Sequence, residues 1–175
     1  MHSKSAASTA DASIVRVREY LGLTAVGRFF HSLHPAFPFL ADKPTVVSDC
    51  VTSQLLFWTI VAVASRVSPA HAHLYRQLLH PIRRLVMASV HDPDGQLQQI
   101  QALLILCVWP LPYGSNTDDP TWMYCGIASH KALGIGLHRV SSKQEFDPGY
   151  QSRPGKEIDR IRNNVWAACF VANHL

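Results

Sequence analysis

Residues 97–109 read LQQIQALLILCVW, and this stretch decides the fold. Its apolar residues recur at intervals of three and four, which is the spacing of one face of an α-helix. The pattern is carried by Leu97, Ile100, Leu103, Leu104, Cys107 and Val108. A membrane-spanning helix needs roughly 20 apolar residues, about twice the length of this run. The stretch therefore predicts a buried core helix that ends before Pro110.

The same spacing predicts helices on both sides of this stretch. Upstream, we expect a helix over residues 14–33 and a second one from Ser48 to Arg66, with a cap at Ser48 or Asp49. A third helix is expected from Pro69 to Val90, with a kink at Pro81. Downstream, we expect one helix over residues 121–140, opened by Asp119 and Pro120, and a last one from Lys156.

The last helix is expected to be amphipathic. One face would hold Ile158, Ile161, Val165, Ala168, Cys169 and Ala172, and the solvated side would hold Arg160, Arg162 and Asn163. No segment alternates apolar and polar residues with a period of two. The sequence thus predicts an all-α fold, an irregular array of about six helices. Residues 1–13 are rich in Ser and Ala and are predicted to be disordered, leaving 14–175 as the domain.

The composition restricts the class of function. Apolar residues make up 47% of the 175 residues and charged residues only 16%, which excludes a largely disordered chain. The net charge is +4, and Arg83-Arg84 is the densest basic pair. A DNA-binding face clusters Lys and Arg, so this segment is not expected to contact nucleic acid directly.

Residues 121–140, TWMYCGIASHKALGIGLHRV, carry the side chains of a reactive site. However, His130 and His138 are eight residues apart without a carboxylate between them, which does not fit a helical zinc pair. Cys125 and His130 are five apart and would point to different sides of a helix. The stretch is therefore not predicted to be catalytic or to bind a metal.

The three glycines of this stretch call for a separate explanation. Each glycine inside a helix costs about 0.8–1 kcal/mol relative to alanine. Close packing by a neighbouring helix can offset that cost, so Gly126 and Ala132 are predicted to mark a tight helix–helix contact. Ile127 and Leu137 would fill gaps, while Lys131 and Arg139 would reach outward.

The remaining candidates also favour structural roles. The four cysteines, Cys50, Cys107, Cys125 and Cys169, form no CxxC pair and are expected to be buried thiols. His71 and His73 are two residues apart, which is the wrong geometry for a pair on a helix, and His31 and His34 can share a face but have few acids nearby. The aspartates Asp92, Asp94, Asp118 and Asp119 lie in expected turns. No catalytic, cofactor-binding or metal-binding residue is predicted.

Several stretches resemble one known family. Trp122, Gly126, Ala128 and Ala132, followed by GLHR at 136–139, resemble the signature helix of the fungal-specific transcription factor domain, the middle regulatory region of binuclear zinc cluster transcription factors. Four more pieces occur in the family's order: FFHSLHPAFPFL (29–40), SQLLFWTIVAVASR (53–66), LQQIQALLILCVW (97–109) and EIDRIRNNVWAACFVANHL (157–175). The resemblance covers residues 24–175 and is nearest the subgroup of the leucine-biosynthesis regulator and the secreted-protease activator.

This resemblance implies a nuclear regulatory domain that performs no chemistry. Its partners would be transcriptional coregulators or a small effector, and a homodimer is also compatible. The family's Cys-rich zinc cluster is missing, so no cofactor is expected in this chain. We also expect the chain to be the N-terminal part of a larger helical domain, truncated at its C-terminus. Two alternatives remain: a small His/Cys-dependent helical enzyme, and a helical protein that lies on a membrane surface.

Overall fold

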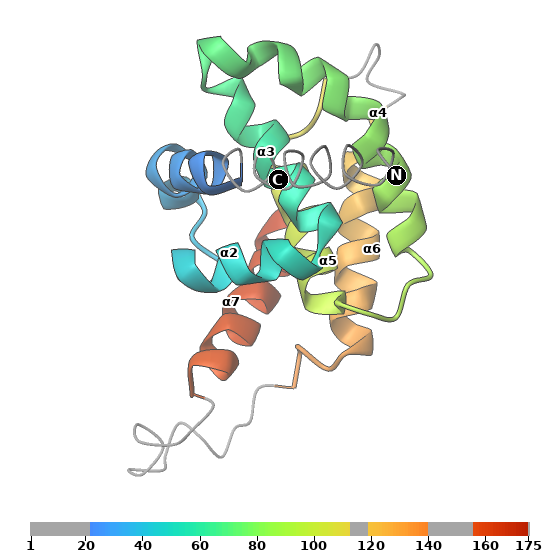
Figure 1. Ribbon diagram of the computed structural model, residues 1–175. Helices are drawn as coiled ribbons and strands as arrows, with labels where there is room; N and C mark the ends of the chain where they lie inside the picture. The colour runs from blue at the N-terminus through green and yellow to red at the C-terminus, as the bar shows by residue number, and fades with distance from the viewer. Residues whose placement is uncertain (1–21, 113–118, 140–155, 175) are drawn as a thin grey trace, which may run out of the picture.

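The computed structural model describes residues 22–112, 119–139 and 156–174, and these residues are helical, with no strand among them (Figure 1). The predicted all-α class is therefore confirmed. The helices are residues 22–32, α2 (Lys43–Thr52), α3 (Gln54–Arg66), α4 (Ala72–Ser89), α5 (Gln96–Val108), α6 (Thr121–Gly134) and α7 (Lys156–Ala172). Two 3-10 turns, η1 (His34–Ala36) and η2 (Pro69–His71), connect them. The predicted disordered segment, 1–13, lies outside the described residues.

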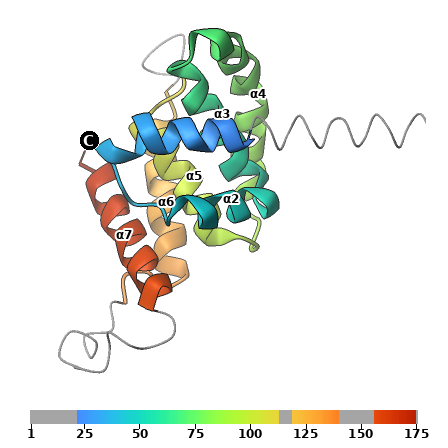
Figure 2. The same ribbon diagram turned by 60° about the vertical axis from the view of Figure 1, so that its left-hand side comes forward.

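Helix α5 is the centre of the fold. It packs against α3, α6 and α7, and both views place it among the other helices (Figures 1 and 2). All nine residues from Gln99 to Cys107 are buried. A helix that is apolar on every side needs neighbours on every side, so α5 fixes where the surrounding helices lie.

The predicted helix from Ser48 to Arg66 is wrong, because the chain forms two helices there. Residue Ser53 adopts an extended backbone (φ −102°, ψ 101°) between α2 and α3, and its hydroxyl accepts from the backbone N–H of Leu56. Helix α2 starts earlier than predicted, at Lys43, and Asp42 is its N-cap. Pro44 lies in the first turn of α2, where its missing N–H is not needed.

The predicted helix over residues 121–140 is too long. Helix α6 ends at Gly134, and Gly136 adopts φ +71° just beyond it. The N–H of Leu137 donates to the carbonyl of Ala132, and that of Gly136 donates to Leu133. This pair of bonds is the Schellman motif, in which a left-handed residue ends a helix. At the other end, the N-cap is Pro120 and not Asp119 as predicted, because α6 begins at Thr121. Asp119 precedes the cap and accepts from the Thr121 N–H at 2.9 Å.

Helix α7 begins at Lys156 as predicted, but two of its side chains differ from expectation. Ile158 was assigned to the apolar face and is 62% exposed. Arg162 was assigned to the solvated side, yet its guanidinium donates to the carbonyl of Ile135 at 3.0 Å. The last carbonyls of a helix lack partners within it, so a basic side chain there stabilises the end of α6.

The small residues of α6 have two different environments. Ala128 and Ala132 are fully buried, as a close helix contact requires. Gly126 and Gly134 are not: a Cβ on either would meet nothing within 4 Å. The predicted close contact at Gly126 is therefore wrong for the described part of the chain, and that glycine lies in open space.

Substituting alanine at two glycines should change stability in opposite directions. Gly126→Ala should raise the free energy of unfolding by about 0.5–1 kcal/mol, because it removes a helix-interior glycine without a clash. Gly136→Ala should lower it by about 1 kcal/mol, because alanine disfavours the left-handed region. Chemical denaturation of both variants measures this. A lower free energy of unfolding for Gly126→Ala would contradict the open space around Gly126.

Candidate functional site

Three of the described histidines, His34, His71 and His130, contact other protein groups. His71 accepts at Nδ1 from the Arg28 guanidinium at 3.2 Å and pairs with the Ser68 hydroxyl at 2.9 Å. His130 donates from Nδ1 to the carbonyl of Gly126 at 2.8 Å. His34 stacks on the Phe30 ring, and burial lowers its pKa. Among residues 22–112, 119–139 and 156–174, no three His, Cys, Asp or Glu side chains are grouped so that they could hold a metal ion.

Three cysteines that are distant in sequence meet in the core. Cys107 of α5, Cys125 of α6 and Cys169 of α7 are all buried. The thiols of Cys107 and Cys125 share a hydrogen bond, and Cys169 lies close enough for its charge to act on Cys107. Sequence spacing could not show this meeting. The available signal was that each cysteine falls among the apolar residues of its own helix.

The environment of these thiols disfavours reactivity. Burial raises the pKa of Cys169 to about 12, and burial followed by the neighbouring Cys125 raises that of Cys107 still further. Since the thiolate is the nucleophile, thiols that stay protonated at neutral pH are poor nucleophiles. The predicted structural role of the cysteines fits this arrangement, and the interaction of Cys125 is with Cys107 rather than with His130.

The native chain should therefore resist thiol reagents. At pH 7.5 Cys107, Cys125 and Cys169 should react with a disulfide reagent at least about a hundredfold more slowly than in denaturant, since ionisation is suppressed by burial. Unfolded thiols ionise near pH 8.5–9, whereas the folded ones ionise only at higher pH. The protonated, buried thiols therefore contribute to the free energy of unfolding below about pH 8, and their contribution is lost at more alkaline pH. Rapid labelling of the three thiols in the native state would contradict this.

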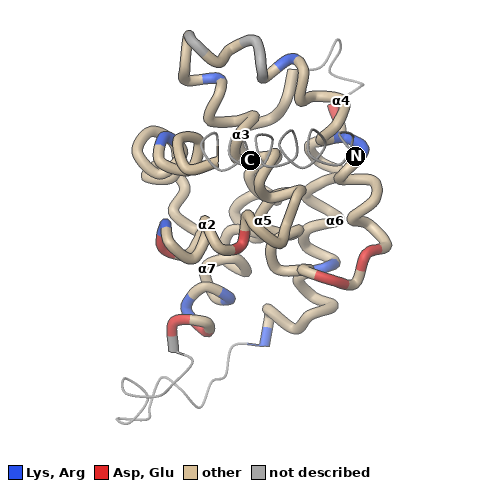
Figure 3. Tube along the Cα trace, in the orientation of Figure 1, with Lys and Arg blue, Asp and Glu red and all other residues tan. Residues whose placement is uncertain are grey.

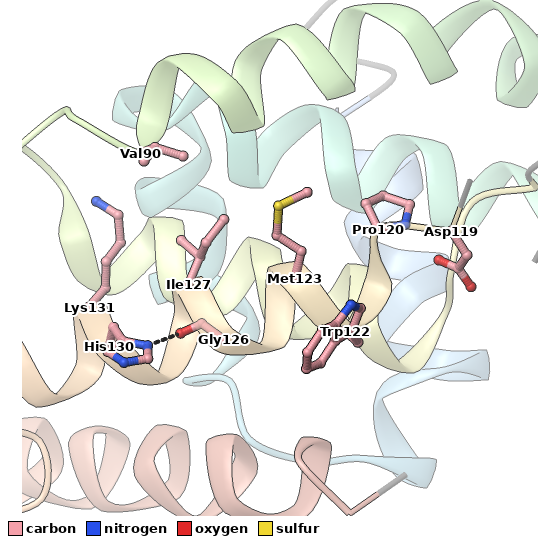
Figure 4. A pocket seen from close by; sticks show the side chains of 9 residues that line it. All are labelled: Val90, Asp119, Pro120, Trp122, Met123, Gly126, Ile127, His130 and Lys131. Atoms are coloured by element: carbon pink, nitrogen blue, oxygen red, sulfur yellow. Dashed lines mark hydrogen bonds between the residues drawn. The ribbon is translucent and has the colours of Figure 1, made fainter. Parts of the chain in front are cut away.

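The outer face of α6 lines a groove on the surface of the described chain. Figure 4 shows α6 with α4 on one side of it and α7 on the other. A groove of about 720 Å³ runs along this face, and Val90, just after α4, contributes to its lining. We call the part of the lining that lies on α6 the open stripe; it consists of Trp122, Met123, Gly126, Ile127, His130 and Lys131.

The open stripe is apolar at one end and basic at the other. Trp122 is 85% exposed and Met123 is 50% exposed, both near the start of α6. Lys131 lies two turns further on, where its ammonium donates to Gln99 Oε1 at 2.7 Å and to the Asp92 carbonyl at 3.3 Å. Lys131 was predicted to reach outward; instead it bridges from α6 to α5. An exposed tryptophan beside a groove is a common feature of protein-contact surfaces.

No site was predicted on the open stripe, and Gly126 and Ile127 were expected to pack inside the domain. Ile127 is partly buried and does pack against the core, whereas a Cβ on Gly126 would meet nothing within 4 Å. The structure places the burial on the opposite side of the same helix, at Tyr124, Cys125, Ala128 and Ala132.

Comparison with known proteins shows the family. The model of the fungal-specific transcription factor domain matches residues 26–175. The chain belongs to this family. The match covers nearly the same residues as the resemblance seen in the sequence, which is thereby confirmed. The family consists of transcription factor domains and not of enzymes, so the alternative of a His/Cys-dependent enzyme is not favoured.

Curated relatives agree with this assignment. The chain is 35% identical over 143 residues to the putative transcription factor SEF1 of Kluyveromyces lactis, covering 78% of this chain and 12% of the relative. It is 35% identical over 153 residues to the transcriptional regulatory protein SEF1 of Candida albicans, covering 80% of this chain and 16% of the relative. The chain thus spans less than a fifth of the length of these relatives. No solved structure matches it. The resemblance to the subgroup of the leucine-biosynthesis regulator and the secreted-protease activator stays a prediction.

The family match does not favour the alternative of a membrane-surface protein. None of the described helices is long and apolar enough to cross a bilayer. Lys and Arg are scattered over several helices in the described part of the chain rather than gathered on one (Figure 3). The open stripe of this transcription factor domain is therefore the surface whose function needs an explanation.

Proposed function

We propose that this chain is the regulatory part of a transcription factor that acts in the nucleus, and that the open stripe of α6 is its protein-contact surface. The family match and the names of the relatives support the first statement. The observation that carries the second is Trp122, which is 85% exposed although it lies on a helix whose other face is core.

A protein partner fits the open stripe better than a small effector does. A site for a small molecule usually encloses most of its ligand. Here the groove has α6 as its floor, and Trp122 stands almost fully in solvent. Such a surface is covered by another protein surface, with the tryptophan as an anchor. A coregulator of transcription is the class of partner that the family suggests.

The direct test is a reporter assay in cells that make the protein as encoded in its genome. Trp122→Ala should change reporter output several-fold at unchanged protein level, because truncating an anchor residue weakens contact by about 2 kcal/mol or more. Val51→Ala is the matched control, since Val51 is also exposed, at 76%, but lies on α2. Equal output from the parent and the Trp122 variant would refute the assigned surface.

We also propose that this chain alone does not read DNA. The scattered basic residues offer no continuous phosphate-binding face, so any binding should be weak and salt-sensitive. In an electrophoretic shift assay with excess random DNA, no complex should survive about 200 mM salt. A sequence-dependent shift that persists under these conditions would contradict the proposal.

A third part of the proposal is that the chain holds no structural metal. Its four cysteines are buried, and the described His71 and His130 are hydrogen-bonded to other protein groups. Elemental analysis of the dialysed chain should therefore find far less than one equivalent of zinc. A full equivalent that resists a chelator would show that a metal site exists.

A further inference from the structure

The open stripe contains a row of side chains that faces α4. Met123, Ile127 and Lys131 follow one another at intervals of four residues and point from α6 toward α4 (Figure 4). Side chains four residues apart lie one above the other on a helix. The row is therefore one wall of the groove, apolar at Met123 and Ile127 and cationic at Lys131. Trp122 stands beside this wall and is 85% exposed.

The opposite wall belongs to the second half of α4. Val90 lines the groove directly after that helix, and its backbone is still helical (φ −58°, ψ −40°). Met87 precedes Val90 by three positions and Arg83 precedes it by seven, so helical spacing places both on the groove side of α4. Arg83 is exposed and Met87 is 61% exposed. This wall therefore also combines apolar surface with a cation.

The two helices that border the groove carry cations and no acid. No Asp or Glu occurs in α4 or α6, whose Lys and Arg residues are Arg76, Arg83, Arg84 and Lys131. Asp119, at the start of the groove, accepts from the Thr121 N–H. Asp92, whose carbonyl contacts Lys131, accepts through its carboxylate from the Asp94 N–H. A segment that neutralises the walls has to bring its own carboxylates.

Lys131 is the cation whose surroundings favour such a segment most clearly. Its printed acceptors, Gln99 Oε1 and the Asp92 carbonyl, are uncharged, and they hold the ammonium at the edge of the groove. Burial lowers the pKa of Lys131, and the charge of Asp92 acts in the opposite direction. A carboxylate placed beside this ammonium would stabilise its charged form, and the attraction between them is stronger where water is partly excluded.

We propose that the groove between α4 and α6 binds an acidic amphipathic helix of a partner protein. This inference rests on the proposed function, since it names the chemical class of the partner at the same surface. The apolar side of that helix packs on Trp122, Met123 and Ile127, and its carboxylates meet Lys131 and Arg83. An amphipathic helix laid into an apolar groove is a common mode of peptide recognition. The wall from Trp122 to Lys131 is about 13 Å long, so three to four turns of a partner helix cover it.

Fluorescence anisotropy of the 175-residue chain with synthetic peptides tests the proposal. The probe is a labelled peptide of about 14 residues with Leu and Trp at helical spacing and Glu at the remaining positions. One control replaces every Glu by Lys, and a second keeps the composition but scrambles the apolar spacing. The acidic helical peptide should bind with a dissociation constant on the order of 10 μM, at least about tenfold tighter than either control. Equal affinities for the acidic and the basic peptide, or no binding up to about 1 mM, would overturn the proposal.

Two variants place the peptide in the groove. Trp122→Ala and Arg83→Glu, one on each wall, should each raise the dissociation constant of the acidic peptide at least about tenfold. Lys43→Glu is the matched charge reversal, since Lys43 is an exposed cation on α2, and it should leave the dissociation constant nearly unchanged. Both groove side chains are exposed, so the thermal midpoints of the variants should stay close to that of the parent. If Trp122→Ala and Lys43→Glu bind the peptide equally well, it does not lie in this groove and the proposal fails.

Competition with DNA distinguishes a helix-binding groove from a general site for polyanions. Random duplex DNA offers phosphates but no apolar face, and its binding fades with salt. At about 150 mM salt, duplex DNA of equal negative charge should therefore displace little of the acidic peptide. Displacement as complete as that by unlabelled peptide would show a polyanion site and overturn the proposal.

The reporter assay separates this inference from the proposed function. If Trp122→Ala changes reporter output but the acidic peptide binds no better than the basic one, the open stripe is a protein-contact surface and the acidic-helix proposal fails. If the acidic peptide binds selectively but Trp122→Ala leaves reporter output unchanged, the acidic-helix proposal holds and the regulatory role of the surface fails.

Discussion

The burial of α5 on every side is the constraint on which the rest of the structure depends. Nine consecutive residues, Gln99 to Cys107, are removed from water, and two of them are glutamines. Gln99 is satisfied by Lys131 from α6 and by the Asp94 carbonyl, so its burial also fixes α6 against α5. Helix α7 closes the remaining side, where Cys169 lies near Cys107. Because one face of α6 packs against α5 and α7, its opposite face stays exposed.

The parts of the fold that could be predicted are those that local periodicity determines. The three-and-four spacing of residues 97–109 and the start of the last helix at Lys156 agree with the structure. The break at Ser53 lies in the polar run Thr52, Ser53 and Gln54, which also fits the solvated side of one continuous helix, so periodicity alone did not show that Ser53 caps a new helix. The same holds for Arg162, whose role depends on a carbonyl 27 residues earlier in the chain.

The candidate site was missed for a physical reason. Small residues in a helix indicate close approach, but they do not say whether the approaching surface lies within the chain. Ala128 and Ala132 are buried in the core, while a Cβ on Gly126 of the same helix would meet nothing within 4 Å. Gly136 has yet another role, since its positive φ ends the helix. Periodicity alone could not tell a buried small residue from an exposed one or from one that ends the helix. It also could not separate the outer face from the core face, because Ile127 and Met123 on the outer face are as apolar as core residues.

The open stripe should be exposed in the free chain and covered in the working assembly. Hydroxyl-radical footprinting of the four tryptophans measures this difference. The other three, Trp58, Trp109 and Trp166, are partly buried against the core and provide internal references. In the dilute chain Trp122 should be the most oxidised of the four, and in the assembly isolated from cells it should become protected relative to them. A Trp122 that is protected in the dilute chain, or equally oxidised in both states, would contradict the claim.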